Sequence, residues 1–345
     1  MKANEYVASK RLLSYLYKSC LQRHIIIIII IKMVFVKKGP IEKLYLKLSN
    51  YNAYRQYKQE LRSYELKNQK KNNSRRPVKN IHVVKSLKEK AELRVLHSGH
   101  AGDIIYALPT LKKIAELKTA RINVYLKVGQ AAALPSHYHT HPQGMFLLND
   151  NMANNLIPLI QDQPYIQHCS VYNNEEIDID LDAFRDGIFN VSSGSIPKWY
   201  GYVTGVNPDL WKKWIFVEQD NVAKDSIIIS RSARYLNQNI DFSFLDKYDR
   251  IKFIGLQSEY DTISKAIKKV EWIQIKDFAE MASIICGCRL FIGNQSLPYA
   301  LAEALKVPRI LEVFPDAPNV VPEGPNGYDY YLQEHLELLV DRLYS

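Results

Sequence analysis

The stretch that decides the fold runs from Leu93 to Leu117 and reads LRVLHSGHAGDIIYALPTLKKIAEL. An apolar run at its start is followed by small residues around Gly99 and Gly102 and then by an amphipathic pattern. This order predicts a strand, a tight loop and a helix, which is the opening unit of an α/β domain. The spacing is neither the glycine fingerprint of dinucleotide enzymes nor a P-loop, because no Gly-Lys-Ser/Thr follows. Pro109 is expected to kink the helix.

Asp103 stands where the expected helix begins. A carboxylate at this point can cap free backbone N–H groups and meet the positive end of the helix dipole. It can equally be the reactive group of a ligand site, because the neighbouring glycines let a ligand approach the backbone closely. The residues alone leave both roles open.

A second stretch, from Arg289 to Pro308, repeats the order of strand, loop and helix. The loop is Gly293-Asn294-Gln295-Ser296, and the helix is expected from about Leu297 to Lys306. Free N–H groups and the helix dipole face a ligand at such a loop, which makes it an anion-binding geometry.

Two arginines follow another predicted strand, Ser226 to Ser230. Arg231 and Arg234 form a plausible diphosphate clamp, because guanidinium groups bind phosphate oxygens through two parallel hydrogen bonds. Solvated surface arginines explain the same pattern equally well. Further along, Asp277 is the expected N-cap of a helix that ends near Cys286.

The two loop-and-helix stretches resemble the motifs of the heptosyltransferase-like glycosyltransferases, glycosyltransferase family 9. Gly-Asp-Ile-Ile-Tyr-Ala-Leu-Pro-Thr-Leu is similar to a first motif in which Gly-Asp and an aliphatic pair precede Leu-Pro-x-Leu. The second stretch resembles Gly-Asn-Asp-Ser/Thr-Gly-Pro followed by His. Three positions depart from it: Gln295 stands for the Asp, Leu297 for the Gly and Ala300 for the His.

The resemblance implies an α/β fold of two Rossmann-like lobes facing a central cleft, the GT-B fold. It implies an inverting, metal-independent enzyme without a cofactor, which moves a heptose-like or other sugar from a nucleotide-diphosphate donor to a hydroxyl of a glycan or glycolipid. Asp103 would be the general base, Arg231 and Arg234 would hold the leaving diphosphate, and Gly293, Asn294, Gln295 and Ser296 would bind the donor. The loop residues Ser98, Gly99, His100 and Gly102 would line the acceptor side.

The alternative function is a non-catalytic nucleotide-sugar- or glycan-binding protein of the same fold. The departures at Gln295 and Ala300 favour it, because they fall among the expected donor contacts. Sugar transfer, as opposed to binding without turnover, would separate the two.

The net charge of +10 is unevenly distributed. Residues 1–92 hold 22 Lys and Arg against 6 Asp and Glu, whereas residues 93–345 hold 24 against 30. The mildly acidic body argues against nucleic-acid binding. Four scattered cysteines are too few for a disulfide framework and indicate a reducing compartment, so a cytoplasmic location is expected.

The basic extension contains seven consecutive isoleucines at 25–31, a run too short for a conventional membrane span of about 20 residues. A membrane-dipping segment and a translation start at Met33 both remain open for it. From Ile41 to Leu66, Leu and Tyr recur at helical spacing among basic residues, which predicts one amphipathic helix. This helix could lie on an anionic membrane surface, giving a peripheral contact, or pack on the body of the protein.

Two patterns invite a metal interpretation and are better explained otherwise. The alternation Ile177-Asp178-Ile179-Asp180-Leu181-Asp182 predicts a strand with a solvated carboxylate face, since Asp-x-Asp alone is a weak signal. The histidines at 137, 139 and 141 read as a polar loop. No metal site is expected.

The patterns divide the chain into four parts. Residues 1–79 are a basic N-terminal extension and linker, 80–218 an N-terminal Rossmann-like acceptor domain, 219–330 a C-terminal Rossmann-like donor domain and 331–345 a C-terminal helix. In the resembled fold the last helix crosses back onto the first domain, so it is expected to couple the lobes.

Overall fold

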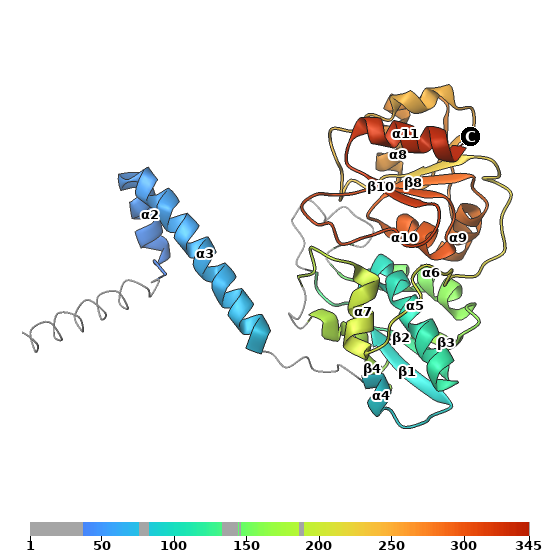
Figure 1. Cartoon of the computed structure of the whole chain (residues 1–345), viewed down its shortest axis with the longest axis horizontal. Helices are drawn as coiled ribbons and strands as arrows, with labels where there is room; N and C mark the ends of the chain where they lie inside the picture. The colour runs from blue at the N-terminus through green and yellow to red at the C-terminus, as the bar shows by residue number, and fades with distance from the viewer. Residues whose placement is uncertain (1–36, 76–82, 133–143, 145, 186–189, 345) are drawn as a thin grey trace, which may run out of the picture. The chain divides into compact units, whose positions relative to one another are not determined.

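A computed structural model describes residues 37–75, 83–132, 144, 146–185 and 190–344, with the backbone alone at 66–75 and 83. The isoleucine run and the histidine-rich loop lie outside these residues, so the expectations for them stay predictions. The chain forms two compact units, Met1–Pro77 and Val78–Ser345 (Figure 1). No helix in the described ranges has both the length and the apolar character needed to cross a membrane.

The first unit contains a pair of helices, α2 (Pro40–Ser49) and α3 (Tyr51–Arg75). The prediction of one helix from Ile41 to Leu66 is therefore wrong. Asn50 causes the break, because its extended backbone ends α2 while its Oδ1 accepts the Ala53 N–H at 3.0 Å, as an N-cap does. At the other end of α2, Glu42 returns to accept the Gly39 N–H at 2.8 Å.

The second unit begins with a lobe built on a four-stranded sheet. Its elements are α4 (Val83–Ser86), β1 (Glu92–His97), α5 (Ala101–Lys118), β2 (Arg121–Leu126), α6 (Asp150–Gln161), β3 (Ile166–Val171), β4 (Ile179–Asp180), the 3-10 helix η2 (Leu181–Arg185) and α7 (Ile196–Thr204). The strands are parallel in the order β3-β2-β1-β4. From β1 the chain first adds strands on one side, β2 and β3, and then returns to add β4 on the other. The loop after β1 and the segment after β4 therefore flank a switch point, where α/β sheets bind ligands.

The second lobe is built on a six-stranded sheet. Its elements are β5 (Ile227–Ser230), the 3-10 helix η3 (Ser243–Lys247), β6 (Ile251–Phe253), α8 (Gln257–Ala266), β7 (Val270–Trp272), α9 (Phe278–Cys286), β8 (Leu290–Asn294), α10 (Leu297–Leu305), β9 (Arg309–Glu312), β10 (Gly327–Tyr330) and α11 (Gln333–Tyr344). All strands are parallel, in the order β10-β9-β8-β5-β6-β7. The switch point here lies between β5 and β8.

The expected class, α/β with two Rossmann-like lobes, is confirmed. Central strands such as β5 and β8 are buried throughout, as parallel strands covered on both faces must be. Asp277 caps α9 as expected, accepting the Glu280 N–H at 2.8 Å.

Pro109 lies inside α5, which continues to Lys118. Proline has no N–H, so the carbonyl of Ile105, four residues earlier, has no helical partner. The buried indole of Trp214 supplies the missing donor at 3.1 Å. Because the backbone N–H of Trp214 also donates to the Ala304 carbonyl of α10 at 3.1 Å, this residue joins α5 to the second lobe.

The C-terminal helix does not cross to the first lobe as expected. Leu336, Leu339 and Val340 of α11 belong to the apolar core under the six-stranded sheet. The helix is also held at its surface by an ion pair of 2.7 Å between Lys247 and Asp341. An apolar stripe on one face of α11 thus covers its own sheet (Figure 1).

Candidate functional site

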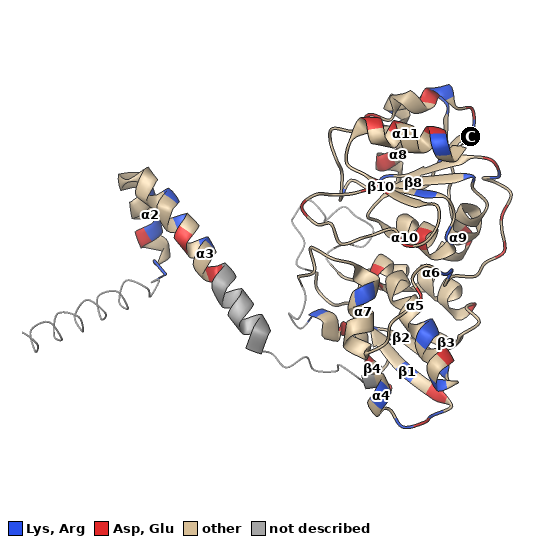
Figure 2. Cartoon of the chain, viewed as in Figure 1, with Lys and Arg blue, Asp and Glu red and all other residues tan. Residues whose placement is uncertain are grey.

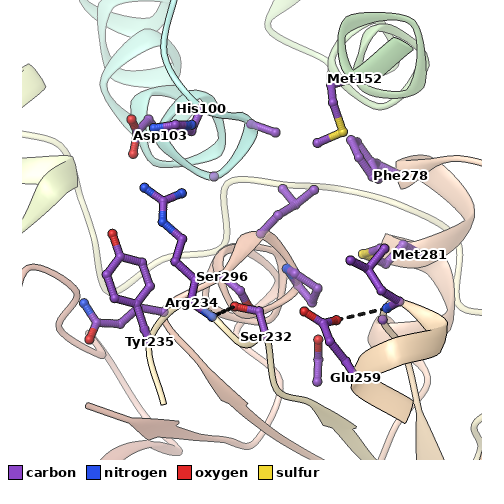
Figure 3. A pocket seen from close by; sticks show the side chains of 18 of the residues that line it. His100, Asp103, Met152, Ser232, Arg234, Tyr235, Glu259, Phe278, Met281 and Ser296 are labelled. Carbon is purple, nitrogen blue, oxygen red and sulfur yellow. Dashed lines mark hydrogen bonds between the residues drawn. The ribbon is translucent and has the colours of Figure 1, made fainter. Parts of the chain in front are cut away.

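A cavity of about 560 Å³ lies between the two lobes at the carboxyl ends of their strands. From the first lobe it is lined by the beginning of α5 and by α6, and from the second by the segments that follow β5, β6, β7 and β8 (Figure 3). Both switch points therefore open on the same space, which is where the fold places ligands.

The N-termini of α5 and α10 meet at this cavity. A Cβ built on Gly102 in the first turn of α5 would lie 3.8 Å from the Cα of Leu297, the first residue of α10. Gly102, Ser296 and Leu297 all line the cavity. Two helix dipoles thus present their positive ends to one space, which favours an anionic group there.

Asp103 lines the cavity from the third position of α5. The hydrogen bond that its Oδ2 accepts comes from Nη2 of Arg185 in η2, at 3.1 Å. The two side chains are only 20% and 26% exposed. The carboxylate is therefore held by a guanidinium from across the switch point. The N-cap position of α5 belongs to His100, while Asp103 in the first turn still lies near the positive end of the helix dipole.

Arg185 is itself fixed on three sides. Its Nη1 donates to Asp182 Oδ1 at 2.8 Å, and its guanidinium lies 4.3 Å from the centre of the Phe184 ring. Gly99 makes room for it, because a Cβ there would lie 2.5 Å from Arg185 Nη2. Asp182 in turn accepts the Ser98 N–H at 3.0 Å, so β1 and η2 together position the pair.

The buried His97, the last residue of β1, holds the loop between β1 and α5. Its Nδ1 accepts the Gly99 N–H at 2.8 Å, so its Nε2–H donates to the Tyr200 hydroxyl, also at 2.8 Å. Burial lowers the pKa of His97 to about 4, which keeps the ring neutral. The 3.9 Å separation between His97 and Asp182 is therefore not an ion pair at neutral pH.

Arg231 does not line the cavity, which corrects its expected place in a diphosphate clamp. Its Nε and Nη2 donate to the two oxygens of the buried Glu312 at 2.7 and 2.9 Å. Its Nη2 also donates to the Asn237 carbonyl at 2.7 Å. The guanidinium of Arg231 therefore directs its paired donors to Glu312 of β9.

Arg234 does line the cavity. Its guanidinium carbon lies 5.1 Å from the centre of the Tyr235 ring. Figure 3 shows the side chain rising from the second lobe toward Asp103 and His100. Arg234 is the one Lys or Arg among the described residues that line this space.

The four residues of the expected donor loop have different roles. Gly293 lies inside the sheet, where a Cβ would come within 2.9 Å of the Ser230 carbonyl. Asn294 is fully buried and holds the loop after β5 through both backbone groups of Ser232, at 3.0 and 2.7 Å, and the Tyr235 carbonyl at 3.0 Å. Neither residue lines the cavity, so both position the backbone around it.

Gln295 and Ser296 do line the cavity. The amide of Gln295 accepts the Phe314 N–H at 2.7 Å and donates to Ala317 and Asn319 at 2.7 and 2.8 Å, so it anchors the following loop. Ser296 is the N-cap residue of α10, and its hydroxyl donates to the Asn294 carbonyl at 3.1 Å. Of the acceptor-side residues, His100 and Gly102 line the cavity, whereas Ser98 and Gly99 lie behind it in the Arg185 network.

Glu259 is a cavity residue that the sequence reasoning missed. Its carboxylate accepts the N–H groups of Leu256 at 3.0 Å and Ala233 at 3.3 Å. Burial raises the pKa of the Glu259 carboxyl above its ordinary value, against these two hydrogen bonds. Glu259 stands in the first turn of α8 after an N-cap leucine, where an acidic residue is ordinary, so no local signal marked it.

An apolar wall was also missed. It is made of Met152 from α6 and of Trp272, Phe278 and Met281 from the second lobe. Figure 3 shows three of these side chains, Met152, Phe278 and Met281, together on one side of the cavity. A flat apolar group such as a nucleobase suits a wall of this kind.

The carboxylates of the Asp-x-Asp stretch do not form the solvated strand face that was expected. β4 contains only Ile179 and Asp180, while Asp178 accepts the Arg94 N–H at 2.9 Å and pairs with Lys90. Asp182 belongs to the Arg185 network. Within the described ranges, no three His, Cys, Asp or Glu side chains converge closely enough to hold a metal ion.

No family model matches the sequence, and no curated protein matches it. Solved structures do match the fold. A family 9 glycosyl transferase from Veillonella parvula DSM 2008 has a TM-score of 0.51 at 10% identity, covering 74% of this chain and 97% of that one. The E. coli heptosyltransferase WaaC with ADP has a TM-score of 0.52 at 9% identity, covering 73% and 99%. The same enzyme with ADP-2-deoxy-2-fluoro heptose gives 0.50 at 8% identity, with the same coverage.

These similarities show the fold. The second unit has the two-lobed GT-B architecture of family 9 glycosyltransferases and heptosyltransferases, as the sequence motifs indicated.

Proposed function

We propose that this chain is a nucleotide-sugar glycosyltransferase that inverts configuration and needs no metal ion. The observation that carries the proposal is the convergence on one cavity of a held carboxylate, Asp103, a guanidinium, Arg234, and the N-terminus of α10. A transferase of this kind needs a proton acceptor on one side of the sugar and positive potential on the other. The first lobe offers the proton acceptor, Asp103, and the second lobe offers the positive potential, from Arg234 and the start of α10.

The chemistry is a single displacement at the anomeric carbon. An acceptor hydroxyl attacks that carbon, Asp103 takes the hydroxyl proton, and the bond to the diphosphate oxygen breaks with its electron pair. The leaving nucleoside diphosphate gains negative charge, which Arg234 and the N–H groups at the start of α10 stabilise. Positive potential from these groups does the work that a divalent cation does in other enzymes.

The donor nucleotide is assigned to the second lobe and the acceptor, a glycan or glycolipid hydroxyl, to the first. The apolar wall of Met152, Trp272, Phe278 and Met281 suits a nucleobase. The Glu259 carboxylate offers acceptor oxygens for sugar hydroxyls at the same end. The complexes of the E. coli heptosyltransferase with ADP and with an ADP-heptose analogue support a nucleotide-diphosphate donor.

A donor panel tests the proposal. Calorimetry with ADP-, GDP- and UDP-sugars on the full chain identifies the nucleotide that binds, and sugar transfer to glycan acceptors is then followed with and without EDTA. We expect one nucleotide class to bind and transfer to be unchanged by EDTA. Loss of transfer that Mg²⁺ or Mn²⁺ restores would contradict the metal-independent mechanism.

The rival is a binding protein that has lost catalysis. Its support is the position of Gln295, whose amide is fully used by the 314–319 loop, and of Ala300, which is buried in α10. Donor binding without transfer to any acceptor, in protein whose Asp103 and Arg234 are intact, would favour it.

A further inference from the structure

The α2 stripe is an exposed apolar row on the first unit. Ile41, Leu44, Tyr45 and Leu48 follow the spacing of one helix face, and Tyr51 at the start of α3 extends the row. These five side chains are between 58% and 83% exposed. A soluble amphipathic helix buries such a face, and among the residues that the structure describes the α2 stripe has no apolar cover.

The hairpin itself uses the opposite side of α2. Tyr57 of α3 is buried, and its hydroxyl accepts the Lys38 N–H at 3.0 Å, while Leu46 on the side of α2 away from the stripe is partly buried. Packing of α2 on α3 thus leaves the α2 stripe facing outward.

The surroundings of the α2 stripe are basic. Residues 37–65 contain seven Lys and Arg against three Asp and Glu, and Figure 2 shows basic residues along both helices. Lys47 borders the stripe on one flank, and Lys43, one turn earlier, lies farther round the helix toward the partly buried side of Leu46. The opposite flank carries Glu42, which is used by the N-cap of the helix.

We propose that the α2 stripe is a docking surface for an anionic lipid bilayer, on which α2 lies flat. Leucine, isoleucine and tyrosine side chains enter the boundary between headgroups and acyl chains, while Lys47 at the flank meets the lipid phosphates and Lys43, farther from the bilayer, adds to the positive potential. Tyrosine suits this boundary because its ring is apolar and its hydroxyl stays wet.

Charge and apolar surface together favour a lipid bilayer over a second copy of the chain or a nucleic acid. Residues 37–65 carry seven Lys and Arg against three Asp and Glu, so pairing of two copies stripe on stripe would bring two segments of net positive charge together, whereas an anionic surface is complementary to them. A nucleic-acid backbone is complementary in charge but offers nothing to five exposed apolar side chains. This proposal does not depend on the activity assigned to the cavity.

Vesicle co-sedimentation of the full chain tests the docking surface. The vesicles are an equimolar mixture of phosphatidylcholine and phosphatidylglycerol, with pure phosphatidylcholine as the neutral comparison. We expect binding to the anionic vesicles that weakens as salt is raised. Binding of equal strength to both vesicles, or to neither, would overturn the proposal.

Two matched variants locate the surface. Leu44→Gln with Leu48→Gln removes apolar surface from the α2 stripe and keeps good helix formers, so binding should weaken at least about tenfold. Leu332→Gln with Leu338→Gln makes the same change at side chains that are 67% and 64% exposed on the second unit, and binding should not change. Equal binding by both variants would place the contact elsewhere and overturn the proposal.

A third variant and a second measurement complete the test. Lys43→Gln with Lys47→Gln should weaken binding to anionic vesicles and leave any residual binding to neutral ones unchanged. Sedimentation velocity without lipid gives the mass of the chain. A concentration-dependent dimer that the Leu44 and Leu48 changes abolish, together with absent vesicle binding, would assign the α2 stripe to a second copy instead.

Discussion

Arg185 donates a hydrogen bond of 3.1 Å to Asp103, joining η2 to the first turn of α5 across the switch point of the first sheet. The guanidinium is held from behind by Asp182 and Phe184. The carboxylate therefore faces the cavity in one defined orientation. A base that is held in this way needs no rearrangement before it accepts a proton.

Removing this contact should affect turnover more than binding. In Arg185→Ala the Asp103 carboxylate is free to rotate, so kcat should fall by about 10–100-fold while the donor KM changes little. Arg185→Lys should recover part of the loss, because one ammonium can reach one carboxylate but cannot bridge two as the planar fork does. Steady-state kinetics and melting temperatures on the three proteins give the answer. A loss of kcat that merely follows a loss of stability would reduce Arg185 to a structural residue.

The two arginines after β5 should separate into different roles. Arg234→Ala removes a charge-assisted phosphate contact worth about 1.5–3 kcal/mol, so binding of the preferred nucleoside diphosphate should weaken by an order of magnitude or more. Calorimetry at a temperature where the variant is folded measures this loss.

Arg231→Ala is the matched comparison. It leaves Glu312 buried without its partner, which should lower the free energy of unfolding by about 3–5 kcal/mol and leave the nucleotide affinity of the folded protein unchanged. If Arg231→Ala weakens nucleotide binding as much as Arg234→Ala does, the assignment of Arg231 to the scaffold is wrong.

A double-mutant cycle tests the link between Trp214 and Pro109. Trp214→Phe leaves the Ile105 carbonyl buried and unpaired, which should cost about 1–3 kcal/mol of stability. Pro109→Ala restores a backbone N–H that can donate to the same carbonyl, so Trp214→Phe should cost clearly less in that background. Denaturant unfolding of the four proteins measures the coupling. Equal costs in both backgrounds would show that the indole stabilises by packing alone.

Stability should depend on pH through His97. Its pKa falls from 6.5 to about 4 on folding because of burial, so the unfolded chain binds the proton more tightly. The resulting stability is fully present above about pH 6.5 and is lost as pH falls toward 4, by about 3 kcal/mol in total. The free energy of unfolding of His97→Gln should depend less on pH than that of the parent between about pH 6.5 and 5, where the aspartates contribute little to the pH dependence. Parallel pH curves for the two proteins would place the titrating group elsewhere.

Local patterns in the sequence predicted the elements that carry a strong local signal. The strand at Leu93 and the short loop after it, the cap at Asp277 and the turn into α10 are confirmed, because spacing and capping chemistry are readable within a few residues. The helix after the first loop begins at Ala101, two residues before the expected start at Asp103. The break at Asn50 was missed because the same residue types continue on either side of it. The predicted single helix therefore ran through Asn50, which is the C-cap of α2 and also caps the start of α3.

The site was less predictable because its contacts join distant segments. Arg185 reaches Asp103 from 82 residues away, and Glu312 takes Arg231 from 81 residues away. No spacing rule reveals either pairing. The sequence therefore marked Arg231 and Arg234 as equivalent, and only the register of β9 beside β8 distinguishes them.

The most direct test of the account is Asp103→Asn. The amide keeps an oxygen for Arg185, and a partly exposed ion pair contributes about 1 kcal/mol or less, so the melting temperature should barely change. Donor binding should also be retained, whereas loss of the general base should lower turnover by about 10²–10⁴-fold. Turnover, donor affinity and melting temperature are measured on the same preparation. A stable, donor-binding variant with little turnover is the predicted result, and a stable variant with near-normal turnover would contradict the central claim.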